Sequence, residues 1–127
     1  MLAAKLFGAN DVRLVECEIP TISDDEILLK TAAAAICGTD LRMIGNGYKG
    51  VDENHPRTLG HEISGIIEKV GKNVKGYTPG MHVSVAPNIG CGICDQCVNG
   101  NTHLCPDYQA FGINMDGGFA EYVRIPS

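Results

Sequence analysis

Apolar and polar residues alternate in several short segments of the chain, and no segment shows a sustained helical repeat. In residues 12–19, apolar side chains at positions 15, 17 and 19 alternate with glutamates, which is the pattern of a half-buried strand. A turn at residues 8–10 joins this segment to an expected strand over residues 5–7. Cys17 is therefore expected to pack in the core.

Four further segments predict strands, at residues 26–36, 64–70, 82–87 and 119–125. The first of them, EILLKTAAAAI, is expected to form a long buried strand, although its alanines would also suit a helix. One or two helical turns are expected at residues 39–44, after Gly38. The sequence thus predicts a mostly β fold, a partly open β-barrel with short helices.

Composition and charge narrow the class of protein. The chain has 127 residues, of which 44% are hydrophobic and 20% are charged, which is typical of one folded domain. The net charge is −5 without a cluster of Lys and Arg, so neither nucleic acid nor an anionic membrane is expected as a partner. No apolar run approaches the roughly 18 residues of a membrane span, and the first residues do not resemble a signal peptide. We therefore expect a cytoplasmic protein with reduced thiols.

Four of the six cysteines lie close together, with the spacing Cys91-x2-Cys94-x2-Cys97-x7-Cys105. The residues around them are mainly polar or glycine, so this segment has little apolar material with which to fold by itself. Four thiolates suit a tetrahedral zinc ion and leave it no open position. The sequence therefore predicts a structural zinc lobe over residues 90–105.

Two alternatives stay open for these cysteines. They could be free or joined in disulfides, although an even number of cysteines alone does not account for this spacing. They could also bind the iron–sulfur cluster of a small electron carrier, because Cys105 is followed by proline as in one cluster motif. The final gap of seven residues and the lack of a second cysteine set favour zinc.

A second candidate metal site combines Cys37, His61 and Glu62. Cysteine and histidine are both zinc ligands, and each adjoins a glycine, Gly38 or Gly60, at which the backbone can turn sharply. Spacing alone cannot join the two, because they are 24 positions apart. Taken alone, the cysteine would be a small buried residue and the histidine an ordinary hydrogen-bonded one.

Taken in order, CGTD (residues 37–40), GHEISG (60–65), the four-cysteine segment and DGGFAEY (116–122) resemble the zinc-containing medium-chain alcohol dehydrogenases. The resemblance covers residues 4–126 and is greatest to the branch of polyol and L-threonine dehydrogenases. It implies that residues 1–127 form the N-terminal catalytic domain of this family, which has a GroES-like fold.

The resemblance also implies roles for individual residues. Cys37 and His61 match ligands of a catalytic zinc, and Glu62 matches a carboxylate that binds this zinc or lies behind it. Thr39 matches the hydroxyl that hydrogen-bonds the substrate alcohol and begins a proton relay. Asp40 matches the acid that hydrogen-bonds the zinc-bound imidazole and holds its tautomer. The four lobe cysteines match the ligands of the family's structural zinc.

In this family, zinc lowers the pKa of the substrate alcohol, and the alkoxide gives a hydride to NAD or NADP. The resemblance therefore implies a dehydrogenase that oxidises a secondary alcohol or polyol, with Zn2+ and NAD or NADP as cofactors. The full-length enzyme would be a homo-oligomer that acts on a small molecule. An L-threonine 3-dehydrogenase-like enzyme and a non-enzymatic, zinc-stabilised β module are the alternatives.

The chain departs from the family at several points. Its G-x-G-x-x-G string, residues 45–50, follows the expected helical turns rather than a strand, so no nucleotide-binding loop is expected and the chain by itself is expected to be inactive. Arg42 occupies a position where many members have a relay histidine, and arginine cannot shuttle a proton at neutral pH. Met81-His82 replaces a common Asp-Arg pair. His55 and His103 match no functional position and are expected at the surface.

Overall fold

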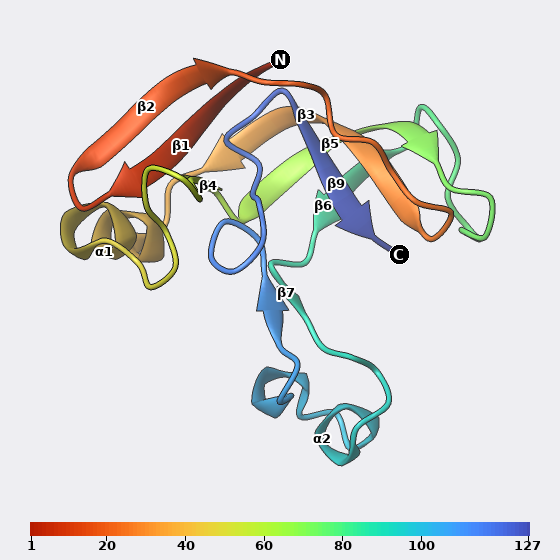
Figure 1. Cartoon of the computed structure of the whole chain (residues 1–127). Coiled ribbons are helices and arrows are strands. Elements are labelled where there is room, and N and C mark those ends of the chain that lie inside the picture. The colour runs from red at the N-terminus through yellow and green to blue at the C-terminus, as the bar shows by residue number, and fades with distance from the viewer.

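The regular structure of the protein is mainly β, as a computed structural model describing residues 1–127 shows (Figure 1). The strands are β1 (Leu2–Gly8), β2 (Asp11–Glu16), β3 (Glu26–Ala35), β4 (Arg57–Thr58), β5 (Glu62–Val70), β6 (His82–Val85), β7 (Asn88–Ile89), β8 (Gln109–Ala110) and β9 (Tyr122–Pro126). The helices are α1 (Gly38–Asn46), α2 (Asp95–Val98) and the short 3-10 helix η1 (Thr102–Leu104). None of these helices has the length and apolar character that crossing a membrane requires.

An antiparallel sheet of four strands, in the order β6-β5-β3-β9, forms the centre of the fold. A second antiparallel sheet has the order β2-β1-β4, and a bridge between Ala3 and Ala120 joins it to the segment before β9. The strands do not close into a complete barrel. The two sheets confirm the predicted mostly β fold with a partly open barrel.

A large hydrophobic cluster lies against the four-stranded sheet. It consists of Ile27, Leu29, Ile63, Ile67, Phe111 and Val123. These side chains come from alternate positions of β3, β5 and β9, so the sheet buries one face. Phe111 enters from the loop after β8 and is fully buried.

A smaller hydrophobic cluster positions the candidate site. It contains Leu6 of β1, Met43 of α1 and Leu59, which lies two residues before His61. Because protein cores are closely packed, this cluster fixes α1 against the segment that carries His61. Cys37, at the start of α1, is thereby held close to the histidine.

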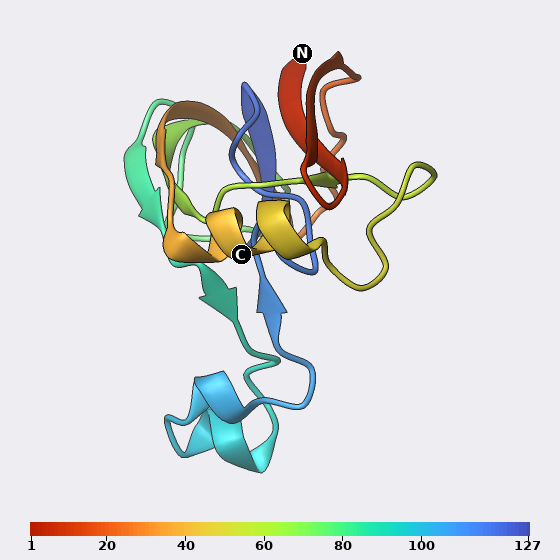
Figure 2. The same ribbon diagram turned by 90° about the vertical axis from the view of Figure 1, so that its left-hand side faces the viewer.

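The predicted zinc lobe projects away from both sheets (Figures 1 and 2). The paired strands β7 and β8 connect it to the body of the molecule. Its large apolar side chains face solvent, since Ile93, Val98 and Leu104 are 86%, 67% and 58% exposed. The lobe therefore lacks an apolar core, which fits the prediction that a metal orders it.

The structure changes the ends of several predicted elements. The helical turns expected at residues 39–44 form the middle of a longer helix, α1. The strand expected at 64–70 begins two residues earlier, at Glu62. The expected strands at 12–19 and 82–87 end early, and the one at 119–125 starts late. The pattern missed β4, β7, β8, α2 and η1, because elements of two to four residues are too short to show a period.

Two expectations about burial were wrong. Cys17 lies outside both clusters and is only half-buried, because it extends the edge strand β2, on which Val15 of the same face is only half-buried as well. The alanine-rich half of segment 26–36 is mostly exposed, and Ile36 at its end is 70% exposed. His55 and His103 are exposed, as predicted.

Candidate metal centres

Cys37 stands between the end of β3 and the start of α1. Its backbone is extended, with φ −104° and ψ 161°, and it is the N-cap residue of the helix. The backbone N–H of Cys37 donates a hydrogen bond of 2.8 Å to Oδ2 of Asp40 in the first helical turn. This bond satisfies a backbone donor at the helix start and holds Cys37 in place there.

Gly60 brings the second segment to the same region. Its φ of +89° favours glycine, and a Cβ at this position would lie 2.5 Å from the ring of Phe119. The N–H of Gly60 donates a hydrogen bond of 3.2 Å to Oδ1 of Asp40. One carboxylate therefore binds the backbone beside Cys37 and the backbone beside His61.

The side chains of Cys37, His61 and Glu62 converge. The sulfur, a ring nitrogen and a carboxylate oxygen all lie within 4.8 Å of one another. His61 is buried, Cys37 is half-buried and Glu62 is exposed. One sulfur, one nitrogen and one oxygen are donors that suit zinc, and three donors leave one position of a tetrahedral ion open.

His61 has a ring nitrogen that the protein does not satisfy. Nδ1 is buried and has no hydrogen-bond partner, and Oδ1 of Asp40 lies 3.9 Å from it. That distance is too long for a hydrogen bond, so the predicted bond between Asp40 and His61 is wrong. The carboxylate bonds to two backbone N–H groups instead. Since buried polar atoms rarely lack a partner, the orphaned nitrogen indicates a ring adapted to a ligand.

Thr39 and Arg42 lie one turn apart on α1. Nη2 of Arg42 donates a hydrogen bond of 3.2 Å to Oγ1 of Thr39. Side chains three residues apart on a helix are neighbours, and both tilt toward its N-terminus. The guanidinium therefore lies beside the hydroxyl that follows Cys37 by two residues.

The four lobe cysteines form a second centre. The sulfur atoms of Cys91, Cys94, Cys97 and Cys105 all lie within 4.8 Å of one another. Backbone N–H groups point at them: that of Cys94 donates to Cys91 Sγ at 3.4 Å, and that of Cys97 to Cys94 Sγ at 3.5 Å. Four sulfurs around one point fit a closed, tetrahedral zinc site.

The lobe thiols differ in acidity. Backbone N–H groups of Ile93 and Cys94 lower the pKa of Cys91 from 9.0 to about 7. The N–H of Gly92 acts in the same direction on Cys97, but burial and the three neighbouring thiols outweigh it and raise the pKa of Cys97 to about 12. Near neutral pH, Cys91 is therefore partly a thiolate, whereas Cys97 gives up its proton only when a cation replaces it.

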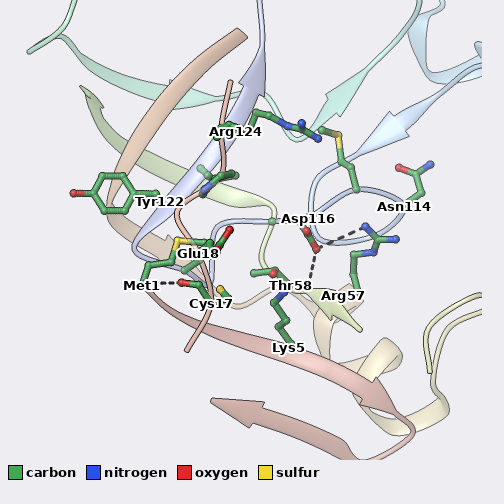
Figure 3. A pocket seen from close by; sticks show the side chains of 16 residues that line it. Met1, Lys5, Cys17, Glu18, Arg57, Thr58, Asn114, Asp116, Tyr122 and Arg124 are labelled. Atoms are coloured by element: carbon green, nitrogen blue, oxygen red, sulfur yellow. Dashed lines mark hydrogen bonds and ion pairs between the residues drawn. The ribbon is translucent and has the colours of Figure 1, made fainter. Parts of the chain in front are cut away.

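A cavity of about 490 Å³ lies apart from both centres, between β1, β4 and β9 (Figure 3). Its wall is charged and includes Arg57, Asp116 and Arg124. Oδ1 of Asp116 accepts a hydrogen bond of 2.9 Å from the N–H of Thr58. None of the three candidate ligands Cys37, His61 and Glu62 lines this cavity.

A second hollow, of about 440 Å³, borders Glu62 and runs along the exposed alanines of β3. Its floor includes Ser64 and Val85 from β5 and β6. The candidate site therefore adjoins an open surface of the sheet and is accessible to a small molecule.

Two features that shape the centres escaped sequence reasoning. Phe119 packs so closely on Gly60 that no side chain fits there, and a Cβ on Gly90 would lie 2.7 Å from Cys97 Sγ. The one signal in the sequence was a glycine next to a candidate ligand. A glycine in the sequence does not indicate which residue packs against it.

The sequence model of the protein family "alcohol dehydrogenase GroES-like domain" matches residues 23–127 of this chain. The chain therefore belongs to the family of alcohol dehydrogenase GroES-like domains, and the resemblance found in its motifs is confirmed.

Individual relatives agree with this assignment. L-threonine 3-dehydrogenase from Caldanaerobacter subterraneus subsp. tengcongensis is 40% identical over 123 residues, which cover 96% of this chain and 35% of that protein. Galactitol-1-phosphate dehydrogenase from Escherichia coli is 38% identical in its crystal structure, with a TM-score of 0.91 over 99% of this chain and 36% of the other. The cobalt- and zinc-bound alcohol dehydrogenase from Pyrobaculum aerophilum is 31% identical, with a TM-score of 0.89 over 99% of this chain and 39% of the other. The chain thus spans 35–39% of the length of these relatives.

Proposed function

We propose that residues 1–127 are the catalytic domain of a zinc-dependent dehydrogenase that oxidises a secondary alcohol or polyol and transfers hydride to NAD or NADP. The observation that carries this proposal is the convergence of Cys37, His61 and Glu62 within 4.8 Å. A mixed donor set with an open position is typical of catalytic zinc sites, whereas four sulfurs are typical of structural ones.

Zinc bound by Cys37, His61 and Glu62 would polarise the oxygen of the substrate alcohol and lower its pKa. The buried carboxylate of Asp40 lies 3.9 Å from Nδ1 of His61 and makes no hydrogen bond to it. It accepts the backbone N–H groups of Cys37 and Gly60. Asp40 is thus a positioning residue that holds both ligand segments.

Thr39 provides the contact to the substrate hydroxyl. Its oxygen accepts a hydrogen bond from Arg42 through one lone pair, so the other lone pair can accept the proton of the substrate alcohol while the Thr39 proton is passed on. Since arginine does not release a proton at neutral pH, Thr39 passes its proton to solvent or to the cofactor rather than through residue 42.

The relatives support the substrate class. The dehydrogenases described above are named for L-threonine and galactitol 1-phosphate, and both compounds are secondary alcohols. The G-x-G-x-x-G string at residues 45–50 follows helix α1 and leads into no further helix before β4, so it is not the strand–loop–helix unit that binds a nucleotide. We therefore propose that the chain acts together with a nucleotide-binding domain, in a homo-oligomer. The chain alone is expected to be inactive.

We further propose that Cys91, Cys94, Cys97 and Cys105 hold a structural zinc. The lobe has converging sulfurs and exposed apolar side chains, so a metal is its main source of order. Because this site is closed, it takes no part in the reaction.

Removal and return of zinc test the proposal. The enzyme in which this chain is joined to its nucleotide-binding domain is assayed with NAD+ or NADP+ and sorbitol, before and after dialysis against a chelator. We expect turnover to disappear and to return with zinc, but not in Cys37→Ser. Turnover that survives complete zinc removal would contradict the proposal, and no hydride transfer with any polyol or L-threonine would favour a non-enzymatic zinc module.

A further inference from the structure

Three of the four arginines form ion pairs with carboxylates, and Arg42 does not. The pairs are Arg13 with Asp11 and Glu53, Arg57 with Asp116, and Arg124 with Glu26. Arg42 is exposed and has no carboxylate oxygen within 4.0 Å. Its positive charge is therefore not compensated within the protein.

The uncompensated charge lies beside Thr39, two residues after the candidate zinc ligand Cys37. The hydrogen bond from Nη2 of Arg42 to Oγ1 of Thr39 places the guanidinium next to the residue proposed to contact the substrate hydroxyl. This bond occupies one of the five N–H donors of the guanidinium. The other donors form no hydrogen bond to the protein, so they are available to a ligand.

We propose that Arg42 binds an anionic oxygen group, a carboxylate or a phosphate, on a ligand that occupies the centre formed by Cys37, His61 and Glu62. The planar fork of a guanidinium matches two oxygens of such a group, and a charge-assisted pair of this kind is strong and directional. Thr39 then contacts the reacting hydroxyl while Arg42 contacts a charged group a few bonds away. This inference rests on the proposed function and narrows its substrate class.

The anionic group can come from two sources, which kinetics distinguish. One is a substrate that carries a phosphate or carboxylate beside its hydroxyl, and the other is a phosphate of the nicotinamide cofactor. The whole enzyme and its Arg42→Gln, Arg42→Lys and Lys49→Gln variants are assayed with sorbitol and with sorbitol 6-phosphate. Gln at position 42 still donates a hydrogen bond to Thr39 but carries no charge, and Lys49 is an exposed cation that serves as the control.

If the substrate carries the anion, Arg42→Gln lowers kcat/KM for sorbitol 6-phosphate about 10- to 100-fold, the range for a charge-assisted hydrogen bond. The value for sorbitol changes less than about threefold, and Arg42→Lys restores part of the loss because it keeps the charge but not the fork. If the cofactor supplies the anion, KM for the cofactor rises equally with both substrates. Lys49→Gln changes neither kcat/KM for the two substrates nor KM for the cofactor. Equal values in wild type and Arg42→Gln for both substrates and the cofactor would overturn the proposal.

A binding measurement separates this inference from the proposed function. The 15N-labelled, zinc-loaded chain is titrated with sorbitol 6-phosphate, sorbitol and ADP, and the Nε–Hε signal of Arg42 is followed by NMR. A shift with either phosphate compound but not with sorbitol supports the proposal even if no polyol is oxidised. Polyol oxidation with neither a shift nor a kinetic effect at residue 42 would overturn it and leave the proposed function intact.

Discussion

The N–H of Gly60 donates a hydrogen bond of 3.2 Å to the carboxylate of Asp40, 20 residues earlier in the chain. The same carboxylate accepts the N–H of Cys37 at 2.8 Å and is 1% exposed. A buried carboxylate is tolerated because both of its oxygens have donors. The arrangement explains how a cysteine and a histidine far apart in sequence reach one point.

Replacing Asp40 by Asn should loosen this link. An amide has one acceptor oxygen, so only one of the two backbone N–H groups, that of Cys37 or that of Gly60, keeps its partner. We expect the free energy of unfolding to fall by about 1 to 3 kcal/mol, and zinc at the Cys37 centre to be bound more weakly. Urea unfolding and zinc analysis measure the two effects.

Asp116→Asn is the matched control, because Asp116 is exposed, accepts one backbone N–H, that of Thr58 at 2.9 Å, and forms a long ion pair of 3.7 Å with Arg57. Its amide keeps the hydrogen bond and loses only the ion pair, so a change below about 1 kcal/mol is expected. Equal losses of unfolding free energy in Asp40→Asn and Asp116→Asn would contradict a stabilising role for the two backbone hydrogen bonds of Asp40.

Gly60→Ala should distort the segment before His61. Gly60 and Gly76 have similar backbone angles, φ +89° and +81°, but only at Gly60 would a Cβ meet another residue, the Phe119 ring at 2.5 Å. We expect a loss of about 2 to 4 kcal/mol for Gly60→Ala, from strain and overpacking together, against about 1 kcal/mol for Gly76→Ala. Thermal unfolding compares them, and equal losses would rule out the contact with Phe119 as a cause.

These contacts explain which parts of the site could be predicted from the sequence and which could not. The motifs CGTD and GHEISG and the lobe are readable because each combines characteristic residues at short spacing. The bond from Gly60 to Asp40 is not readable, because it depends on how α1 packs against Leu59. Cys17 was misplaced for a related reason: a period of two does not indicate that β2 is an edge strand, on which even Val15 is only half-buried.

Cys97→Ser should empty the lobe without affecting the fold of the sheets. Three sulfurs and a hydroxyl form a weaker zinc site than four thiolates, and the lobe has no apolar core to replace it. We expect about one zinc fewer per chain and new amide hydrogen exchange confined to residues 90–105. Cys17→Ser, at a half-buried cysteine outside the lobe, should change neither measurement. Protection lost throughout the sheets would contradict a local role.

The lobe thiols of the zinc-free chain should differ in reactivity with pH. Because the pKa of Cys91 is lowered to about 7, the folded lobe favours its thiolate. The stability that this preference contributes is complete above the ordinary pKa of 9.0 and is lost as pH falls through about 7. Cys97, with its pKa raised to about 12, stays a thiol over this whole range.

At pH 7, iodoacetamide should therefore modify Cys91 first and Cys97 last, and the rate at Cys91 should fall as the solution is acidified. Mass spectrometry of the digested chain reads each site. Modification of Cys97 as fast as Cys91 would show that the lobe loses these backbone N–H bonds when zinc is removed.

The most direct test of the central claim is the transfer of deuterium from a polyol labelled at its secondary carbon to NAD+ or NADP+, catalysed by the enzyme that contains this chain. Mass spectrometry of the reduced cofactor follows the label in wild type, His61→Ala and the control His55→Ala, whose exposed histidine bonds only to Asp52. The account predicts that wild type and His55→Ala transfer the label at equal rates. It also predicts that His61→Ala is slower by a factor of about 1000 or more, because a catalytic zinc ligand is lost, while the lobe keeps its zinc. Label transfer by His61→Ala at the wild-type rate would contradict it.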